Sequence, residues 1–117
     1  MEFGFTIQFL LNLGTLVLSF APILAFLVLI ISVLAIVIGK QENWSLVDSL
    51  YFGFITASTV GYGDFRPSQN KGKLLAIVIA LCGLILTGVI VASAVESAIL
   101  AYEAINARDV TEVINSR

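Results

Sequence analysis

Thr-Ala-Ser-Thr-Val-Gly-Tyr-Gly-Asp occupies residues 56–64 and guides the interpretation of the whole chain. Glycine takes positive φ at little cost, so Gly61 and Gly63 can alternate with their neighbours between left- and right-handed conformations. Successive carbonyl groups can then point the same way. The stretch therefore predicts a segment that presents backbone oxygens, rather than side chains, to a ligand.

The composition is that of a membrane protein. Hydrophobic residues make up 59% of the 117 residues and charged residues only 12%, whereas soluble domains carry about twice that charged fraction. There is no histidine, and Cys82 is the one cysteine, so a disulfide framework and a metal site built from His or Cys are excluded within one chain. With no nucleophile cluster or acid–base pair, we do not expect an enzyme.

The charges argue against a nucleic-acid partner. The formal net charge is -2, and no basic cluster is larger than Lys71 with Lys73. The sequence also lacks the arginine-repeat helix of voltage sensors.

Two apolar runs flank the glycine-containing segment. The first covers residues 16–38 and the second residues 73–95, with Lys73 reaching the membrane interface. At 1.5 Å per residue, each run is long enough to cross a hydrocarbon core of about 30 Å. We therefore predict an outer helix over 16–38, with Pro22 tolerated near its start, and an inner helix over 73–95.

A shorter helix is predicted between the two runs, over residues 45–57. Ser45 and Asp48 form a capping-box pattern at its start. A helix of this size is roughly 18 Å long, too short to span a bilayer, so it must be re-entrant. Its C-terminal end would direct a partial negative charge at the membrane centre and favour a cation there.

The two ends of the chain complete a single predicted domain over residues 1–117. Residues 1–15 are apolar but interrupted by polar residues, which fits either an interfacial segment or the start of the first helix. Residues 96–117 form a charged tail with helical character at its start, too short for an independent domain.

Residues 59–64, Thr-Val-Gly-Tyr-Gly-Asp, match the selectivity-filter signature of potassium channels without a substitution. Over about residues 16–96 the chain resembles the two-helix pores of prokaryotic potassium channels gated by calcium or another ligand through a regulator-of-conductance domain. The resemblance implies an all-α homotetramer, so that each chain has three identical partners in the lipid bilayer of the cell membrane. It also implies a cytosolic gating domain that this chain does not contain.

The resemblance implies roles for the filter residues. Permeant K⁺ would be bound by the carbonyl oxygens of Thr59, Val60, Gly61 and Tyr62 and by the Thr59 hydroxyl. Gly63, Asp64 and Tyr51 would support the filter, with Tyr51 donating to Asp64, and the Tyr62 ring would lie near Tyr51, Phe52 or Trp44. The family's common tryptophan at Tyr51 and the glutamate that some members carry at Ile55 are both absent.

Two residues of the predicted inner helix and one just beyond its end have two interpretations each. Gly83 and Gly88 are candidate bending points for gating, although glycines in membrane helices also allow close packing. Glu96 is a candidate ring of charge at the inner mouth, although a charge just beyond an apolar run can simply mark the interface.

The charges and the resemblance disagree about orientation. Basic residues are more numerous on the filter side, with Lys40, Arg66, Lys71 and Lys73 there against Arg108 and Arg117 on the other. The positive-inside rule would thus put the filter in the cytoplasm. We follow the channel architecture, which puts the filter outside and both termini in the cytoplasm, because the difference in charge is small.

The leading interpretation is a pore that conducts K⁺ passively and selectively. The alternatives are a weakly selective cation pore, one segment of a potassium transporter built from repeats, and a membrane assembly subunit that does not conduct. Gly61→Ala separates the last from the others, because alanine disfavours the positive φ that a filter needs.

Overall fold

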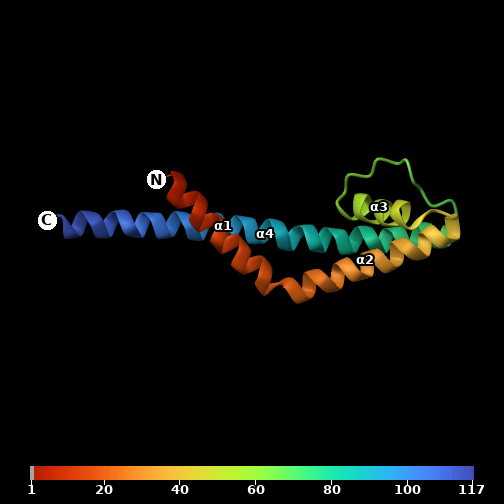
Figure 1. The fold of residues 1–117 in the computed structure, drawn as a ribbon, viewed down its shortest axis with the longest axis horizontal. Helices are drawn as coiled ribbons and strands as arrows, with labels where there is room; N and C mark the ends of the chain where they lie inside the picture. The colour runs from red at the N-terminus through yellow and green to blue at the C-terminus, as the bar shows by residue number, and fades with distance from the viewer. Residues whose placement is uncertain (1) are drawn as a thin grey trace. The chain divides into compact units, whose positions relative to one another are not determined.

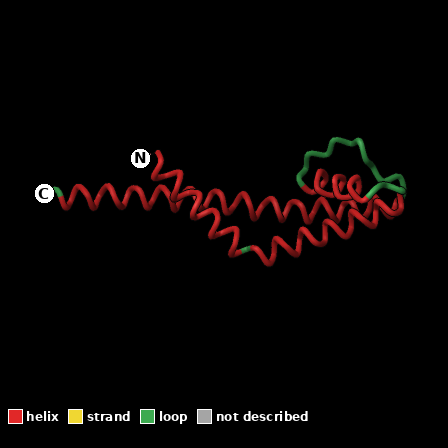
Figure 2. The backbone as a smooth tube through the Cα atoms, in the orientation of Figure 1, coloured by secondary structure: helices red, strands yellow, loops and turns green. Residues whose placement is uncertain are grey.

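The computed structural model describes residues 2–117, which form four helices (Figure 1). They are α1 (Glu2–Ser19), α2 (Ala21–Glu42), α3 (Leu46–Ala57) and α4 (Asn70–Asn115). Figure 2 shows that the described residues outside these helices are turns and loops, with no strand among them. Helices α2 and α4 are long and apolar enough to cross a membrane. The predicted all-α fold, with a short helix between two candidate spans, is confirmed.

The range 16–38, predicted as one helix, belongs to two. Helix α1 ends at Ser19, and α2 begins at Ala21. Pro22 accounts for the break, because proline lacks an N–H, clashes with the carbonyl four residues earlier and is tolerated only in the first turn of a helix. Pro22 therefore starts a helix rather than interrupting one.

Helix α2 continues past residue 38 to Glu42 and ends in a left-handed turn. Asn43 has a φ of 59°, and the Trp44 N–H donates to the Gly39 carbonyl at 2.8 Å. This is the arrangement in which a left-handed residue closes a helix and satisfies one of its last carbonyls.

The chain divides into two compact units, a central unit of residues Pro22–Gly88 and a terminal unit of Met1–Ala21 with Val89–Arg117. The core of the central unit lies where α2, α3 and α4 meet and contains Ile31, Ala35, Ile38, Phe52, Ala57 and Ile79. Two glycines bring its helices close together. A Cβ at Gly39 would overlap the Ser49 side chain, and a Cβ at Gly53 would lie 2.5 Å from that of Ala35.

In the terminal unit, the second part of α4 buries small residues. Ser93, Ser97 and Ala101 lie one turn apart and are all buried. Each serine hydroxyl donates to the carbonyl four residues earlier, Ser93 to Val89 at 2.8 Å and Ser97 to Ser93 at 2.6 Å. Buried hydroxyls are thereby satisfied within the helix.

Both ends of the chain are more helical than the predicted segments. Residues 2–19 form a helix of their own, and α4 runs without interruption through the boundary predicted between residues 95 and 96. Glu96 therefore sits inside a helix, because a single charge does not end a helix when its neighbours favour one.

Candidate ion-selective site

The short helix α3 positions the filter segment. Ser45 caps its N-terminus, since the Ser45 side chain accepts the Asp48 N–H at 3.1 Å. The Ser49 hydroxyl also donates to the Ser45 carbonyl at 2.8 Å. The predicted cap thus starts the helix, which ends at Ala57, two residues before Thr59.

The first filter residues fold back onto the end of α3. The N–H of Thr59 donates to the Thr56 carbonyl at 3.1 Å, and the N–H of Gly61 donates to the Ile55 carbonyl at 3.1 Å. These bonds satisfy carbonyls that every helix end leaves without an intrahelical partner. They also tie the filter to α3, so the end of this helix determines where the filter begins.

The backbone torsion φ alternates in sign along the filter. Thr59, Gly61 and Gly63 have φ values of +66°, +55° and +79°, whereas Val60 and Tyr62 between them do not have positive φ. Such alternation allows successive carbonyls to face one side. Glycine accepts this conformation readily, but a β-branched residue such as Thr59 does so at a cost of order 1–3 kcal/mol.

The filter makes little side-chain contact with its own chain. Residues 58–64 are all exposed, and the side chains of Val60 and Tyr62 are 51% and 70% exposed. A Cβ at Gly61 or Gly63 would meet no atom within 4 Å. Backbone conformation, rather than lack of space, is therefore what requires glycine at these two positions.

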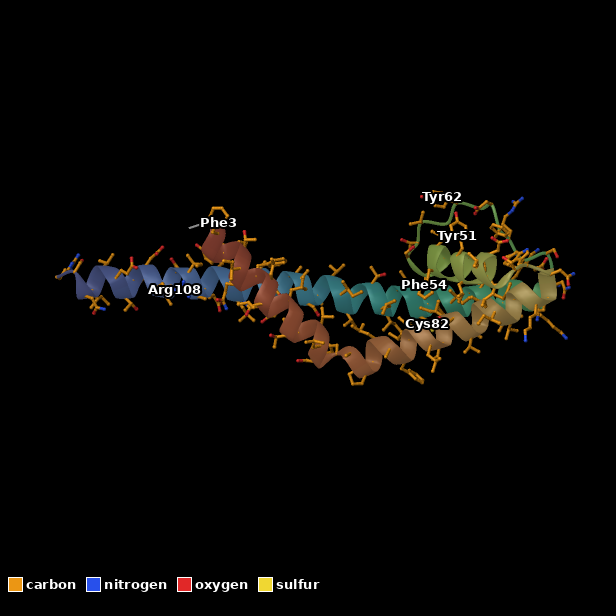
Figure 3. All side chains as sticks on the ribbon, viewed as in Figure 1. Phe3, Tyr51, Phe54, Tyr62, Cys82 and Arg108 are labelled. Carbon is orange, nitrogen blue, oxygen red and sulfur yellow. The ribbon has the colours of Figure 1, made fainter. Side chains whose placement is uncertain are left out.

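Tyr51 and Asp64 come together at the C-terminal end of the filter segment. Figure 3 shows Tyr51 on the side of α3 that faces the loop carrying Tyr62. Partial burial raises the pKa of the Tyr51 phenol, and its hydrogen bond to the Asp64 side chain raises the pKa further. Asp64 Oδ1 also accepts the Phe65 N–H at 3.1 Å. The carboxylate thus links α3 to the chain that leaves the filter.

Phe65, which the sequence analysis did not single out, packs into the aromatic cluster beside α3. Its ring centroid lies 5.2 Å from that of Trp44 and 6.0 Å from that of Tyr51, and Trp44 also packs edge-on against Phe52 at 5.2 Å. Tyr62 is instead mostly exposed. The available signal was an aromatic residue directly after Asp64.

A second contact holds the loop after the filter. The Glu42 carboxylate accepts the Ser68 N–H at 2.7 Å, and the Ser68 hydroxyl lies 2.9 and 3.0 Å from its two oxygens. Because these residues are 26 positions apart and belong to no motif, this pair could not be predicted from the sequence.

The remaining predicted residues lie in α4. Gly83 is buried, and a Cβ there would be 2.5 Å from the Ala57 Cα, whereas a Cβ at Gly88 would meet nothing within 4 Å. Glu96 is exposed and borders a crevice of about 340 Å³ within the terminal unit. The other residues of this crevice are Leu16, Phe20, Val89, Ala92 and Ser93.

Comparison with known proteins places the chain in a family. A family profile described as "Ion channel" matches residues 15–99. Two-pore potassium channel 1 of Arabidopsis thaliana is 34% identical over 71 residues, which is 61% of this chain and 20% of that protein. Potassium channel protein 1 of Methanocaldococcus jannaschii is 33% identical over 57 residues, which is 49% of this chain and 17% of that protein.

The chain spans a fifth or less of the length of these relatives. No solved structure matches it significantly. The profile nevertheless covers well over half of the 117 residues and includes α2, α3, the filter segment and most of the apolar part of α4. The chain therefore belongs to this family of ion channels, and the curated relatives that it matches are named as potassium channels.

Proposed function

We propose that the chain is one subunit of a potassium-selective channel in which four copies arrange residues 59–62 around a shared axis. The carbonyl oxygens of these residues and the Thr59 hydroxyl would replace the water that surrounds K⁺ in solution. Losing that water without replacement is prohibitively costly for an ion. The observation that carries the proposal is the alternation of φ sign from Thr59 to Gly63, because it lets consecutive backbone oxygens face one ion path.

The surroundings of the filter support this role. Helix α3 has the length of a re-entrant helix, and its C-terminal end carries the partial negative charge of the helix dipole beside the filter. The exposure of residues 58–64 leaves this surface available for three identical neighbours. In this proposal Gly63, Asp64 and Tyr51 keep the filter in shape from behind.

The proposal also fixes how the chain lies in the membrane. Helices α2 and α4 cross the bilayer of the cell membrane, the filter opens toward the outside and both termini lie in the cytoplasm. The cytoplasmic part of α4 is where a gating domain of the regulator-of-conductance kind would act. Bending of α4 would open the path, and copies of Glu96 near the inner mouth would concentrate cations.

Purified protein in lipid vesicles tests the function directly. With K⁺ as the only permeant cation, the proposal predicts a K⁺ flux that Ba²⁺ blocks, because Ba²⁺ is close to K⁺ in size but held more strongly by the same oxygens. Replacing K⁺ with Na⁺ should reduce the flux strongly. A Na⁺ flux of similar size would show a weakly selective pore, and the absence of any flux would favour an assembly subunit.

A further inference from the structure

Gly83 is buried against the backbone of the short helix. The atoms nearest to a Cβ built at Gly83 are all main-chain atoms of Ala57, including its carbonyl oxygen, its Cα at 2.5 Å and its carbonyl carbon at 2.6 Å. A flexible side chain could rotate away from such a clash, but a buried helix backbone cannot. Any side chain at position 83 must therefore displace the end of α3.

The end of α3 is also the anchor of the filter. Ala57 is the last residue of the helix and is 3% exposed. Its two preceding residues, Ile55 and Thr56, accept the N–H groups of Gly61 and Thr59. A shift at Ala57 would therefore reach the filter through two hydrogen bonds, and the exposed filter has little other packing within the chain to resist it.

Gly88 provides a contrast within the same helix. It lies five residues after Gly83 in the unbroken α4, is exposed, and has no atom within 4 Å of a Cβ position. The Cβ position at Gly83 is therefore blocked by the Ala57 backbone, whereas the Cβ position at Gly88 is open. The two glycines, which look alike in the sequence, therefore have different surroundings.

We propose that Gly83 is a positioning residue for the selectivity filter: by receiving the Ala57 backbone, it sets the distance of the end of α3, and so of the filter, from α4. This inference rests on the proposed potassium-channel function. It assigns ion selectivity, rather than opening, to the contact between Gly83 and Ala57.

The test compares Gly83→Ala with Gly88→Ala in the full chain. Both changes remove one helical glycine and stiffen α4 similarly, so only the contact with Ala57 differs between them. Reversal potentials in planar bilayers give the K⁺/Na⁺ permeability ratio, and single-channel records give the open probability. We expect Gly83→Ala to lower the permeability ratio by about tenfold or more, as overpacking against a fixed backbone predicts, and Gly88→Ala to leave the ratio unchanged.

The outcomes separate the two proposals. If the unmodified chain does not select K⁺, the proposed function fails, and this inference fails with it. If the unmodified chain selects K⁺ but Gly83→Ala changes only the open probability, Gly83 is a bending point and the inference alone is overturned.

Gly83→Ala chains that do not assemble by themselves can be tested in mixed channels. Tandem-linked chains that carry one Gly83→Ala copy among unmodified copies keep most contacts intact. We expect a reduced K⁺/Na⁺ ratio even with one altered copy, with a tandem carrying one Gly88→Ala copy as the control. A one-copy Gly83→Ala channel with the permeability ratio of the unmodified tandem would overturn the inference.

Discussion

The central and terminal units use small residues in different ways. In the central unit, a Cβ at Gly39, Gly53 or Gly83 would come within 2.6 Å of an atom of a neighbouring helix. In the terminal unit, a Cβ at Gly4 would lie 3.3 Å from the flexible tip of Ile105, and one at Gly14 would meet nothing. The helices around the filter are thus held at fixed separations, whereas the terminal unit tolerates small changes. A function that depends on fixed distances between oxygen atoms requires tight packing of the kind found in the central unit.

The largest effect is expected at the filter itself. Gly61→Ala should abolish K⁺ flux in vesicles, because φ at this position is +55° and alanine is strained there although space is available. Gly14→Ala is the matched control, since it adds the same methyl group where nothing lies within 4 Å and φ is not positive. Equal flux from the two variants would contradict the proposed filter.

A smaller loss is expected from closing the gap between α2 and α3. Gly39→Ala should lower the free energy of unfolding by about 1–3 kcal/mol, because the new methyl overlaps the Ser49 side chain. The control is a double variant in which the side chain is added at position 39 of α2 and removed at position 49 of α3. In Gly39→Ala with Ser49→Gly, the nearest remaining Ser49 atom is Cα at 3.5 Å, so much of the stability should return. Unfolding in mixed micelles measures both, and a swap no better than the single variant would show that the overlap is not the cause.

Short-range patterns in the sequence are enough to predict part of the site. The cap at Ser45 and the glycine spacing of the filter are local signals, and the structure places α3 and two of the positive φ values where these signals point. The sequence does not predict the left-handed Thr59, because β-branched residues rarely take this conformation. Here three-dimensional context outweighs the intrinsic preference.

Contacts between residues far apart in the chain could not be predicted from the sequence. The Glu42–Ser68 pair and the place of Phe65 between Trp44 and Tyr51 depend on how loops return to helices. The role proposed for Gly83 could be inferred only from the position of Ala57 in the structure, since packing glycines and bending glycines look the same in a sequence. Pro22 was recognised, but whether it bends a helix or begins one is decided by its neighbours.

A smaller effect on stability is expected from the Tyr51 hydroxyl in the central unit. Tyr51→Phe removes the hydroxyl that donates to Asp64 and should lower the stability slightly at pH 7. The pKa of Tyr51 is raised, so its contribution is full below the ordinary tyrosine value of about 10 and is lost as pH rises through the raised pKa. Thermal unfolding should therefore show that the difference in Tm between the unmodified protein and Tyr51→Phe is smaller above pH 10 than at pH 7. A difference that does not change with pH would mean that the hydroxyl does not act by donating its proton to Asp64.

The smallest effect, and one of opposite sign, is expected in the terminal unit. Gly14→Ala should raise stability by about 0.5–1 kcal/mol, because it lies within α1, meets no neighbour and removes the entropy cost of a helical glycine. Chemical unfolding of the full chain measures this change. A loss of stability comparable to that of Gly39→Ala would show that the terminal unit is packed as tightly as the central one.

The left-handed conformation of Thr59 links the shape of the proposed filter to the ion that it would bind. A torsion that costs of order 1–3 kcal/mol is kept only while something compensates for it, and the attraction of a dehydrated cation for converging oxygens is a source of that compensation. An empty filter would then have reason to relax toward ordinary torsions and lose its spacing. In the proposed filter, the ion that passes through would also maintain the path, so the conductive shape would be a property of protein and potassium together.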